Sequence, residues 1–428
     1  MLSRMEHDSI GALNVPAEAY YGVQSMRAAT NFQITHRPLH PVLIDSIVMV
    51  KKAAAITNEK SGKLDQQIAQ AIIKACDEIL DGNLRDQFIV DAIQGGAGTS
   101  ANMNANEVIA NRAIEIFGGT KGDYSIVHPN DHVNMSQSTN DVIPTAGKIT
   151  VLKLLPQTIK ELEKLEKAME EKEAEFDDIL KMGRTQLQDA VPMRLGQSFG
   201  AFAHVLKRDI KRLKNVMDEM KVLNIGATAI GTAINVDPYY LANISYELSK
   251  VAGISLKQAD DLIDATQNLD GFVSVSGVLK TCAVDISKIS NDLRLMSSGP
   301  RTGLSEINLP ARQNGSSIMP GKINPVIPEV VSQVAYLIIG HDYTITMAAE
   351  AGQCEEYIEK SVGISTALCP YIGYAKSAEI AKKSLKTGIS VKELVLEEGL
   401  LKEEELKEIL KPEKMTQPMR EKVMKAVS

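Results

Sequence analysis

The chain has 428 residues and a formal net charge of −7, with 44% hydrophobic and 24% charged residues. This length allows two or three domains with a large buried core. Without a basic surplus, a nucleic-acid-binding protein is not expected. The four cysteines are scattered and form no Cys-x-x-Cys pair, which fits a reducing cytosol. No apolar run that we identify approaches the length of a membrane span, so we expect a soluble, cytoplasmic protein.

The first 140 residues are predicted to mix short helices, at 65–81 and 103–117, with loops rich in Gly, Asn and Ser. One of these loops, QGGAGTSANMNANE (94–107), has three glycines followed by Thr99 and Ser100 at a predicted helix start. Glycine lets a backbone approach a ligand closely, and the free N–H groups of a helix N-terminus bind anions. The alternative is a simple Gly-rich turn that ends in a Ser or Thr helix cap.

The segment HPNDHVNMSQSTND (128–141) concentrates hydroxyl and amide side chains, among them Ser138, Thr139 and Asn140. His128 and His132 stand four residues apart, a spacing that suits a metal on a helix. Pro129 lies between them, however, and no acidic or Cys ligand cluster completes the set. We therefore expect no metal here and favour a small, oxygen-rich anion as the ligand.

Long helices are predicted in the middle of the chain, because apolar residues recur there in steps of three, four and seven. The first stripe starts at Leu155, the second starts at about Leu195, and the third covers roughly 260–297. A fourth helix is expected from Pro328, since proline suits the first helical position, and it continues through VAYLII (334–339). Helices of about 40 Å must bury such stripes against one another, which predicts an elongated bundle.

Two further polar segments interrupt these helices. MGRTQLQDAVP (182–192) contains Thr185 and Gln186 and is more polar than a plain turn requires. GSSIMPGKIN (315–324) contains two glycines and a proline, which break regular structure. It also carries two hydroxyls, one cation and one amide, from Ser316, Ser317, Lys322 and Asn324.

None of the four polar segments is a P-loop, a dinucleotide fingerprint or a GxSxG elbow, so no cofactor motif is found. Ser, Thr, Asn, Gln and Lys without a cofactor suit proton abstraction next to a carboxylate. That reaction needs a base, fixed donors for the developing negative charge, and a leaving group on the neighbouring carbon. Ser316 or Ser317 could be the base only if the site stabilises an alkoxide, and Lys322 and the amides could hold the charge.

The loop GSSIMPGKINP resembles the signature loop of the fumarase/aspartase superfamily, and the other three segments resemble its remaining motifs in the same order. Within the superfamily the motifs are most similar to those of aspartate ammonia-lyases, since fumarate hydratases typically carry His where Gln186 stands. The resemblance implies a mainly α, three-domain fold with a central long-helix bundle. We expect an N-terminal mixed domain at 1–140, the bundle at 141–353 and a small helical domain at 354–428.

This resemblance also implies a reaction, the reversible elimination of ammonia from L-aspartate to give fumarate through an aci-carboxylate intermediate. Ser316 matches the serine that removes the C3 proton. The residues that match carboxylate-binding and intermediate-stabilising groups are Thr99, Ser138, Thr139, Asn140, Lys322 and Asn324, and those near the amino group and second carboxylate are Thr185 and Gln186. A homotetramer with active sites shared between subunits is implied, with no cofactor, although some relatives respond to Mg²⁺. Fumarate hydratase and an inactive structural relative remain as alternatives.

The sequence departs from the family pattern at two places. Ala233 stands where the family usually has Gly, so its methyl group is expected to crowd a substrate-facing turn. After Gln353 the family normally continues with several tens of residues that form the last long helix of the bundle. Here CEEYIEKS follows directly, so one bundle helix is expected to be missing.

Overall fold

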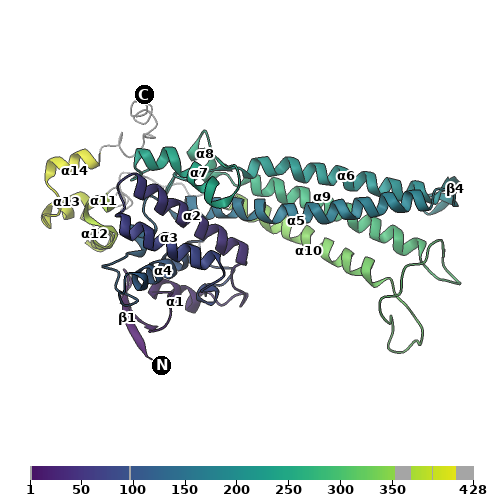
Figure 1. The fold of residues 1–428 in the computed structure, drawn as a ribbon, viewed down its shortest axis with the longest axis horizontal. Coiled ribbons are helices and arrows are strands. Elements are labelled where there is room, and N and C mark those ends of the chain that lie inside the picture. Colours follow the sequence, from purple (N-terminus) through teal and green to yellow (C-terminus); the bar gives the residue numbers. More distant parts are fainter. Residues whose placement is uncertain (1, 96–97, 352–367, 388, 411–428) are drawn as a thin grey trace. The chain divides into compact units, whose positions relative to one another are not determined.

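The computed structural model describes residues 2–95, 98–351, 368–387 and 389–410 (Figure 1). Contacts between Cα atoms divide the chain into two compact units. Unit 1 combines residues 1–150, 221–268 and 352–428, and unit 2 combines residues 151–220 and 269–351. The three-domain division inferred from the sequence stays a prediction.

Unit 1 begins with an antiparallel pair of strands, β1 (Ser3–His7) and β2 (Ala12–Pro16). Its first helices are α1 (Val23–Asn31), α2 (Pro41–Lys60), α3 (Gln66–Leu80), the 3₁₀ turn η1 (Arg85–Gln87), α4 (Thr99–Ile116) and the π-helix η2 (Pro129–Val133). Of these, α3 and α4 correspond to the two helices predicted at 65–81 and 103–117. Asp65 caps α3 by accepting hydrogen bonds from Gln67 N and Ile68 N. Helix α2 packs on α3 and α7, and α4 packs on α1 and α3.

The later elements of unit 1 come from two distant parts of the chain. The first part contains β5 (Val222–Leu223), α7 (Pro238–Ala252), β6 (Lys257–Gln258) and α8 (Leu262–Gln267), with β5 and β6 parallel. The second contains the short helices α11 (Cys369–Ile372), α12 (Tyr374–Thr387), α13 (Val391–Glu397) and α14 (Glu403–Ile409). These short helices share a small core of Leu368, Ile380, Val391, Leu394, Val395 and Leu406.

Unit 2 consists of long helices and one hairpin. Helix α5 (Thr139–Glu175) starts in unit 1 and continues into unit 2 after Thr150, and the rest of unit 2 comprises β3 (Leu180–Thr185), β4 (Gln188–Arg194), α6 (Leu195–Met220), α9 (Asp270–Met296) and α10 (Val326–Glu350). Helix α9 packs on both α6 and α10. The predicted stripes of α5 and α6 are confirmed, since Leu155, Ile159, Phe199 and Leu206 are buried.

The apolar face of α10 is different. Val334 is 50% exposed, Tyr336 60% and Leu337 58%, so the predicted burial of this stripe is not reached within one chain. Only Ser332, Ala335 and Asp342 are buried on this helix. The reason is that α10 packs along α9 with one face, whereas these exposed side chains are not covered by any of the residues that the structure describes.

Two further expectations from the sequence concern membrane-spanning helices and the missing bundle helix. Among the described residues, no helix is both long and apolar enough to cross a membrane. The predicted loss of a bundle helix falls directly after Gln353, which lies outside the described residues.

Candidate active site

The first part of the candidate site is the N-terminus of α4. Thr99 is its first residue and follows Gly98, whose φ of 86° is left-handed. A Cβ at Gly98 would lie 3.1 Å from the side chain of Ile143, so this position both turns the chain and packs against α5. No side chain caps the helix at Gly98. The predicted helix start at Thr99 is confirmed, with helix N–H groups directed toward the N-terminal end.

The second part is the N-terminus of α5, which begins at Thr139. Asn102, in the first turn of α4, donates from Nδ2 to Thr139 Oγ1 at 3.3 Å. Ser138 Oγ accepts a hydrogen bond from Asn140 N at 3.3 Å. The motif residues Ser138, Thr139 and Asn140 therefore stand at one helix N-terminus, and a direct contact links them to the helix that starts at Thr99.

The motif of α5 is held against a turn formed by residues 224–233. Asn140 donates from Nδ2 to Ala229 O at 2.7 Å, and Asn224 donates from Nδ2 to Asn140 O at 3.0 Å. The next residue, Asp141, is fully buried and accepts three backbone N–H groups. Sequence reasoning missed Asp141, because a single Asp after a polar motif resembles an ordinary helix-start residue.

A buried polar network lies behind this motif. Lys51 is fully buried and donates from Nζ to Asn134 Oδ1 at 2.7 Å, and the same oxygen accepts from Asn102 Nδ2 at 3.2 Å. Burial lowers the pKa of Lys51 to about 7, although the charge of Asp141 opposes this shift. Sequence analysis did not single out Lys51, because it lies in an apolar helix far from the motifs. The only feature of the sequence that pointed to this polar network was the high number of asparagines in α4.

Thr185 and Gln186 lie at the tip of the β3–β4 hairpin. The prediction was a turn between two helices, and the structure refines it to a two-residue hairpin turn in which Thr185 pairs with Gln188. Gln186 and Leu187 have φ values of 53° and 61°, a strained conformation for residues other than glycine. Below the tip, Arg184 forms an ion pair with Glu306 at 2.7 Å. The hydrogen bond from Arg184 lowers the pKa of Glu306, and Lys181 adds to the shift.

The loop at 315–324 is closed on itself. Gly315 N donates to Lys322 O at 2.8 Å, and Asn324 donates from Nδ2 to Gly315 O at 3.2 Å. A Cβ at Gly315 would lie 2.6 Å from Asn324 Oδ1 and 2.7 Å from Asn324 N, so only glycine fits without a rearrangement. Asn324 therefore supports the shape of this loop from within.

Ser316 has a distinctive environment inside the loop. Its Oγ accepts backbone N–H groups from Ile318 at 3.2 Å and from Met319 at 3.0 Å. Two N–H donors aimed at one hydroxyl oxygen favour a form in which that oxygen carries negative charge. Lys322 is exposed, and within the described residues its ammonium group has no hydrogen bond or ion pair.

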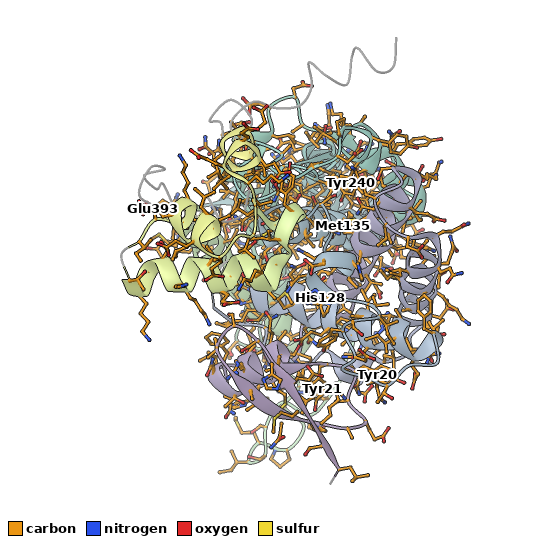
Figure 2. All side chains as sticks on the ribbon, turned by 90° about the vertical axis from the view of Figure 1, so that its left-hand side faces the viewer. Tyr20, Tyr21, His128, Met135, Tyr240 and Glu393 are labelled. Atoms are coloured by element: carbon orange, nitrogen blue, oxygen red, sulfur yellow. The ribbon has the colours of Figure 1, made fainter. Side chains whose placement is uncertain are left out.

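His128, which is labelled in Figure 2, caps the start of η2, and His132 lies within η2. His128 Nδ1 accepts N–H groups from Asn130 and Asp131 at the start of η2, and His132 Nδ1 accepts His128 N at 2.9 Å. Burial lowers the pKa of both imidazoles. The Nδ1 atom of each histidine thus accepts backbone N–H groups. These hydrogen bonds explain why the two histidines stand four residues apart, and no bound metal is needed to explain the spacing.

The predicted site residues thus fall into separate groups. Thr99, Ser138, Thr139 and Asn140 belong to unit 1, whereas Thr185, Gln186, Ser316, Lys322 and Asn324 belong to unit 2. Contacts join the two helix starts of unit 1. Among the described residues of unit 2, no hydrogen bond or ion pair joins the hairpin tip to the 315–324 loop.

Comparison with known proteins gives a consistent result. The family described as Lyase matches residues 11–340, and the family described as Fumarase C C-terminus matches residues 364–417. Aspartate ammonia-lyase of Bacillus sp is 50% identical, with 97% of this chain and 98% of the relative covered. The enzyme of that name from Escherichia coli (strain K12) is 46% identical, with coverages of 97% and 96%.

Solved structures agree with these sequence matches. The fumarate lyase:delta crystallin from Brucella melitensis bound to cobalt is 47% identical, with a TM-score of 0.81, and the match covers 97% of this chain and 100% of that chain. Recombinant class II fumarase from Schistosoma mansoni is 33% identical, with a TM-score of 0.78 and the same coverages.

The comparisons also bear on the predicted loss of a bundle helix. The alignment with the Bacillus sp relative runs over 457 positions, which exceeds the 428 residues of this chain. The relative therefore has residues for which this chain has no counterpart. The junction after Gln353 falls in the interval between the two family matches.

Proposed function

Because this chain belongs to the aspartase branch of the fumarase/aspartase superfamily, it is a carbon–nitrogen lyase, and we propose that it eliminates ammonia from L-aspartate to give fumarate. In this proposal Ser316 removes the C3 proton as an alkoxide, and the amino group departs from the neighbouring carbon. The observation that carries the assignment is the pair of backbone N–H groups, from Ile318 and Met319, directed at Ser316 Oγ.

These donors support Ser316 as the base. A hydrogen bond contributes about 1.5–3 kcal/mol to a charged group and about 0.5–1.5 kcal/mol to a neutral one, so the two N–H groups together would favour the alkoxide over the hydroxyl by roughly 2–3 kcal/mol. The ammonium group of Lys322, six residues further along the same loop, adds a positive charge for the aci-carboxylate that forms when the C3 proton leaves. Loop closure then brings base and charge to the substrate together.

The carboxylates of the substrate are assigned to the remaining predicted residues. Helix N-termini bind carboxylates through free N–H groups and the helix dipole, and two such termini, at Thr99 and Thr139, are joined in unit 1. Ser138 and Asn140 add a hydroxyl and an amide at the second terminus. In unit 2 the polar groups of Thr185 and Gln186 are assigned to the second carboxylate and the amino group, and Asn324 is assigned with Lys322 to the carboxylate that becomes the aci-carboxylate.

We further propose a homotetramer whose active sites are shared between subunits. The exposed apolar face of α10, with Val334, Tyr336 and Leu337 about half exposed, supports an interface there, since contiguous apolar patches mark association sites. Sedimentation equilibrium of the purified protein tests this assembly, and a monomer at micromolar concentration would contradict it. Because the sequence predicts the loss of one bundle helix, this measurement also tests whether such a chain assembles.

The reaction is tested by supplying L-aspartate and L-malate separately and following fumarate by its ultraviolet absorbance. Fumarate from L-aspartate alone is expected. Fumarate from L-malate alone would replace the proposal with a hydratase, and no product from either, in a normally assembled protein, would favour the structural relative.

Three matched variants test the base. Ser316→Ala and Lys322→Ala are expected to lose activity by at least about a thousand-fold while keeping the fold, because removal of base or charge stabilisation costs several kcal/mol. Ser317→Ala removes the neighbouring hydroxyl and is expected to retain most activity. If Ser317→Ala were inactive and Ser316→Ala active, the assignment of the base would move to Ser317.

No bound cofactor enters this proposal. The groups assigned to the reaction are hydroxyls, amides, one ammonium group and helix N–H groups, so Mg²⁺ is assigned no step. Turnover is expected to persist after dialysis against a chelator. A cytoplasmic location is proposed from the scattered cysteines, of which Cys76, Cys282 and Cys369 are free thiols.

A further inference from the structure

Asp141 connects two segments that are far apart in the sequence. Its Oδ1 accepts Ser138 N at 2.9 Å, and its Oδ2 accepts Gly226 N and Thr228 N, both at 3.1 Å. The side chain is fully buried. One carboxylate therefore fixes the backbone of the motif at the start of α5 and the backbone of a turn that follows some 85 residues later.

Two more hydrogen bonds run between the same segments. Asn224 Nδ2 donates to Asn140 O, and Asn140 Nδ2 donates to Ala229 O. We call residues 138–141 and 224–229, joined by these bonds and those of Asp141, the α5 clasp. The turn in the clasp has φ values of 89° at Gly226 and 57° at Thr228. A non-glycine residue in this region persists only where its surroundings hold it, which is what Asp141 does for Thr228 N.

The charge of Asp141 faces groups from two other helices, Lys51 of α2 and Tyr240 of α7. Burial raises the pKa of Asp141 to about 7, while the three N–H groups and Lys51 favour the charged form. An asparagine at this position would offer one acceptor oxygen where the carboxylate offers two. Its NH₂ group would face at least one of the three N–H donors, so at least one bond of the clasp must break.

We propose that Asp141 is a positioning residue that sets the placement of Ser138, Thr139 and Asn140 for substrate binding. This inference rests on the proposed function, in which those three residues bind carboxylate. Asp141 itself is covered by protein and acts through the backbone of the motif. A displacement of about 1 Å in groups that bind substrate can cost about a hundred-fold in rate, so loss of the clasp is expected to weaken substrate binding.

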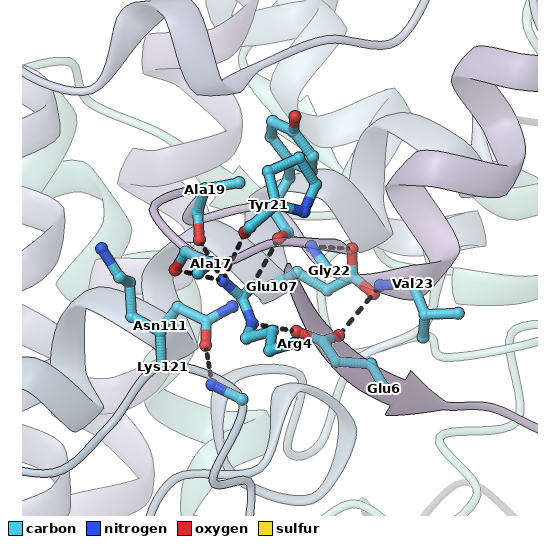
Figure 3. Close-up of polar contacts among 12 residues, drawn as sticks. Arg4, Glu6, Ala17, Ala19, Tyr21, Gly22, Val23, Glu107, Asn111 and Lys121 are labelled. Atoms are coloured by element: carbon cyan, nitrogen blue, oxygen red, sulfur yellow. Dashed lines mark hydrogen bonds and ion pairs between the residues drawn. The ribbon is translucent and has the colours of Figure 1, made fainter. Parts of the chain in front are cut away.

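The test compares Asp141→Asn with a matched control, Glu107→Gln. Glu107 is also a buried carboxylate of unit 1 that accepts three backbone N–H groups, from Gly22, Gln24 and Ser25. Figure 3 shows Glu107 beside Gly22. Burial raises its pKa to about 7 as well. It holds the N-terminus of α1 and makes no hydrogen bond to the clasp. Both variants therefore lose a comparable buried contact, but only one alters the motif.

Asp141→Asn is expected to raise the KM for L-aspartate about ten- to a hundred-fold with a smaller fall in kcat, by the same positional argument. Glu107→Gln is expected to lower thermal stability with KM within about two-fold of wild type, since its contacts lie outside the motif. A second clasp variant, Asn224→Ala, keeps Asp141 charged and is expected to raise KM by a smaller factor. If Asp141→Asn does not fold, Asn224→Ala still tests the positioning role of the clasp.

Amide hydrogen–deuterium exchange provides a readout that does not need turnover. Peptides spanning 136–142 and 224–230 are expected to exchange faster in Asp141→Asn than in wild type or in Glu107→Gln. An unchanged KM in both clasp variants, or an equal rise in KM in Glu107→Gln, would overturn the positioning role. If the wild type made no fumarate from L-aspartate, the proposed function would fail, and exchange would still decide whether Asp141 holds the clasp.

Discussion

Replacement of Ala233 by glycine tests how much backbone strain this chain carries where its family usually has glycine. Ala233 has a φ of 55° and is 2% exposed. Its methyl group is thus covered by protein, and the expectation that this turn faces substrate stays a prediction. The cost lies in the backbone, because an L-residue in the left-handed region is about 1–2 kcal/mol less stable.

Three terms decide the outcome for Ala233→Gly. Relief of strain contributes about 1–2 kcal/mol to stability. Loss of a buried methyl group costs about 0.8 kcal/mol, and the greater freedom of glycine in the unfolded chain costs about 0.5–1 kcal/mol. The variant is therefore expected to be as stable as wild type within about 1 kcal/mol.

Ala227→Gly is the matched control, since Ala227 is fully buried in the same turn and has a negative φ. It loses the methyl group and gains unfolded-state freedom without relief of strain, so it is expected to be destabilised by about 1.3–1.8 kcal/mol. The free energy of unfolding of both variants is measured by urea denaturation, which is followed by circular dichroism at one protein concentration. Equal losses of stability at the two positions would refute the reasoning.

Three other predictions concern separate parts of the chain. Gly315→Ala is expected to lower kcat/KM by about a hundred-fold, because the new Cβ meets Asn324 and shifts the loop; an unaltered rate would contradict this. Glu107 binds its proton more tightly in the folded state, with a pKa of about 7 against an ordinary value of 4.5. Its contribution to stability therefore falls as pH rises from about 4.5 to about 7, by at most about 1.4 kcal/mol per pH unit, and urea midpoints of Glu107→Gln should show a correspondingly flatter pH dependence in that range. Leu337→Glu, on the exposed face of α10, is expected to shift the sedimenting species toward monomers, and an intact tetramer would argue for a different interface.

The sequence by itself predicted the long helices of unit 2 and the family, although it predicted one helix over 260–297 where the structure has α8 and α9. A stripe of apolar residues with a period near 3.6 reports which face of a helix is buried, so α5, α6 and α9 could be located from residue spacing alone. The start of α4 at Thr99 was predictable for a similar reason, because glycine followed by Thr and Ser is a local signal for a helix N-terminus. The polar motifs identified the family because each is contiguous in the chain.

Only the tertiary structure decided which groups meet across the chain. Lys51, Asp141 and Thr228 lie in three distant segments, and their contacts depend on how α2, α5 and the 224–233 turn pack. Backbone angles such as φ at Gln186 also depend on the paired strands around them. Periodicity could not reveal that the α10 stripe is exposed, since an apolar face looks the same whether its partner is the same chain or another.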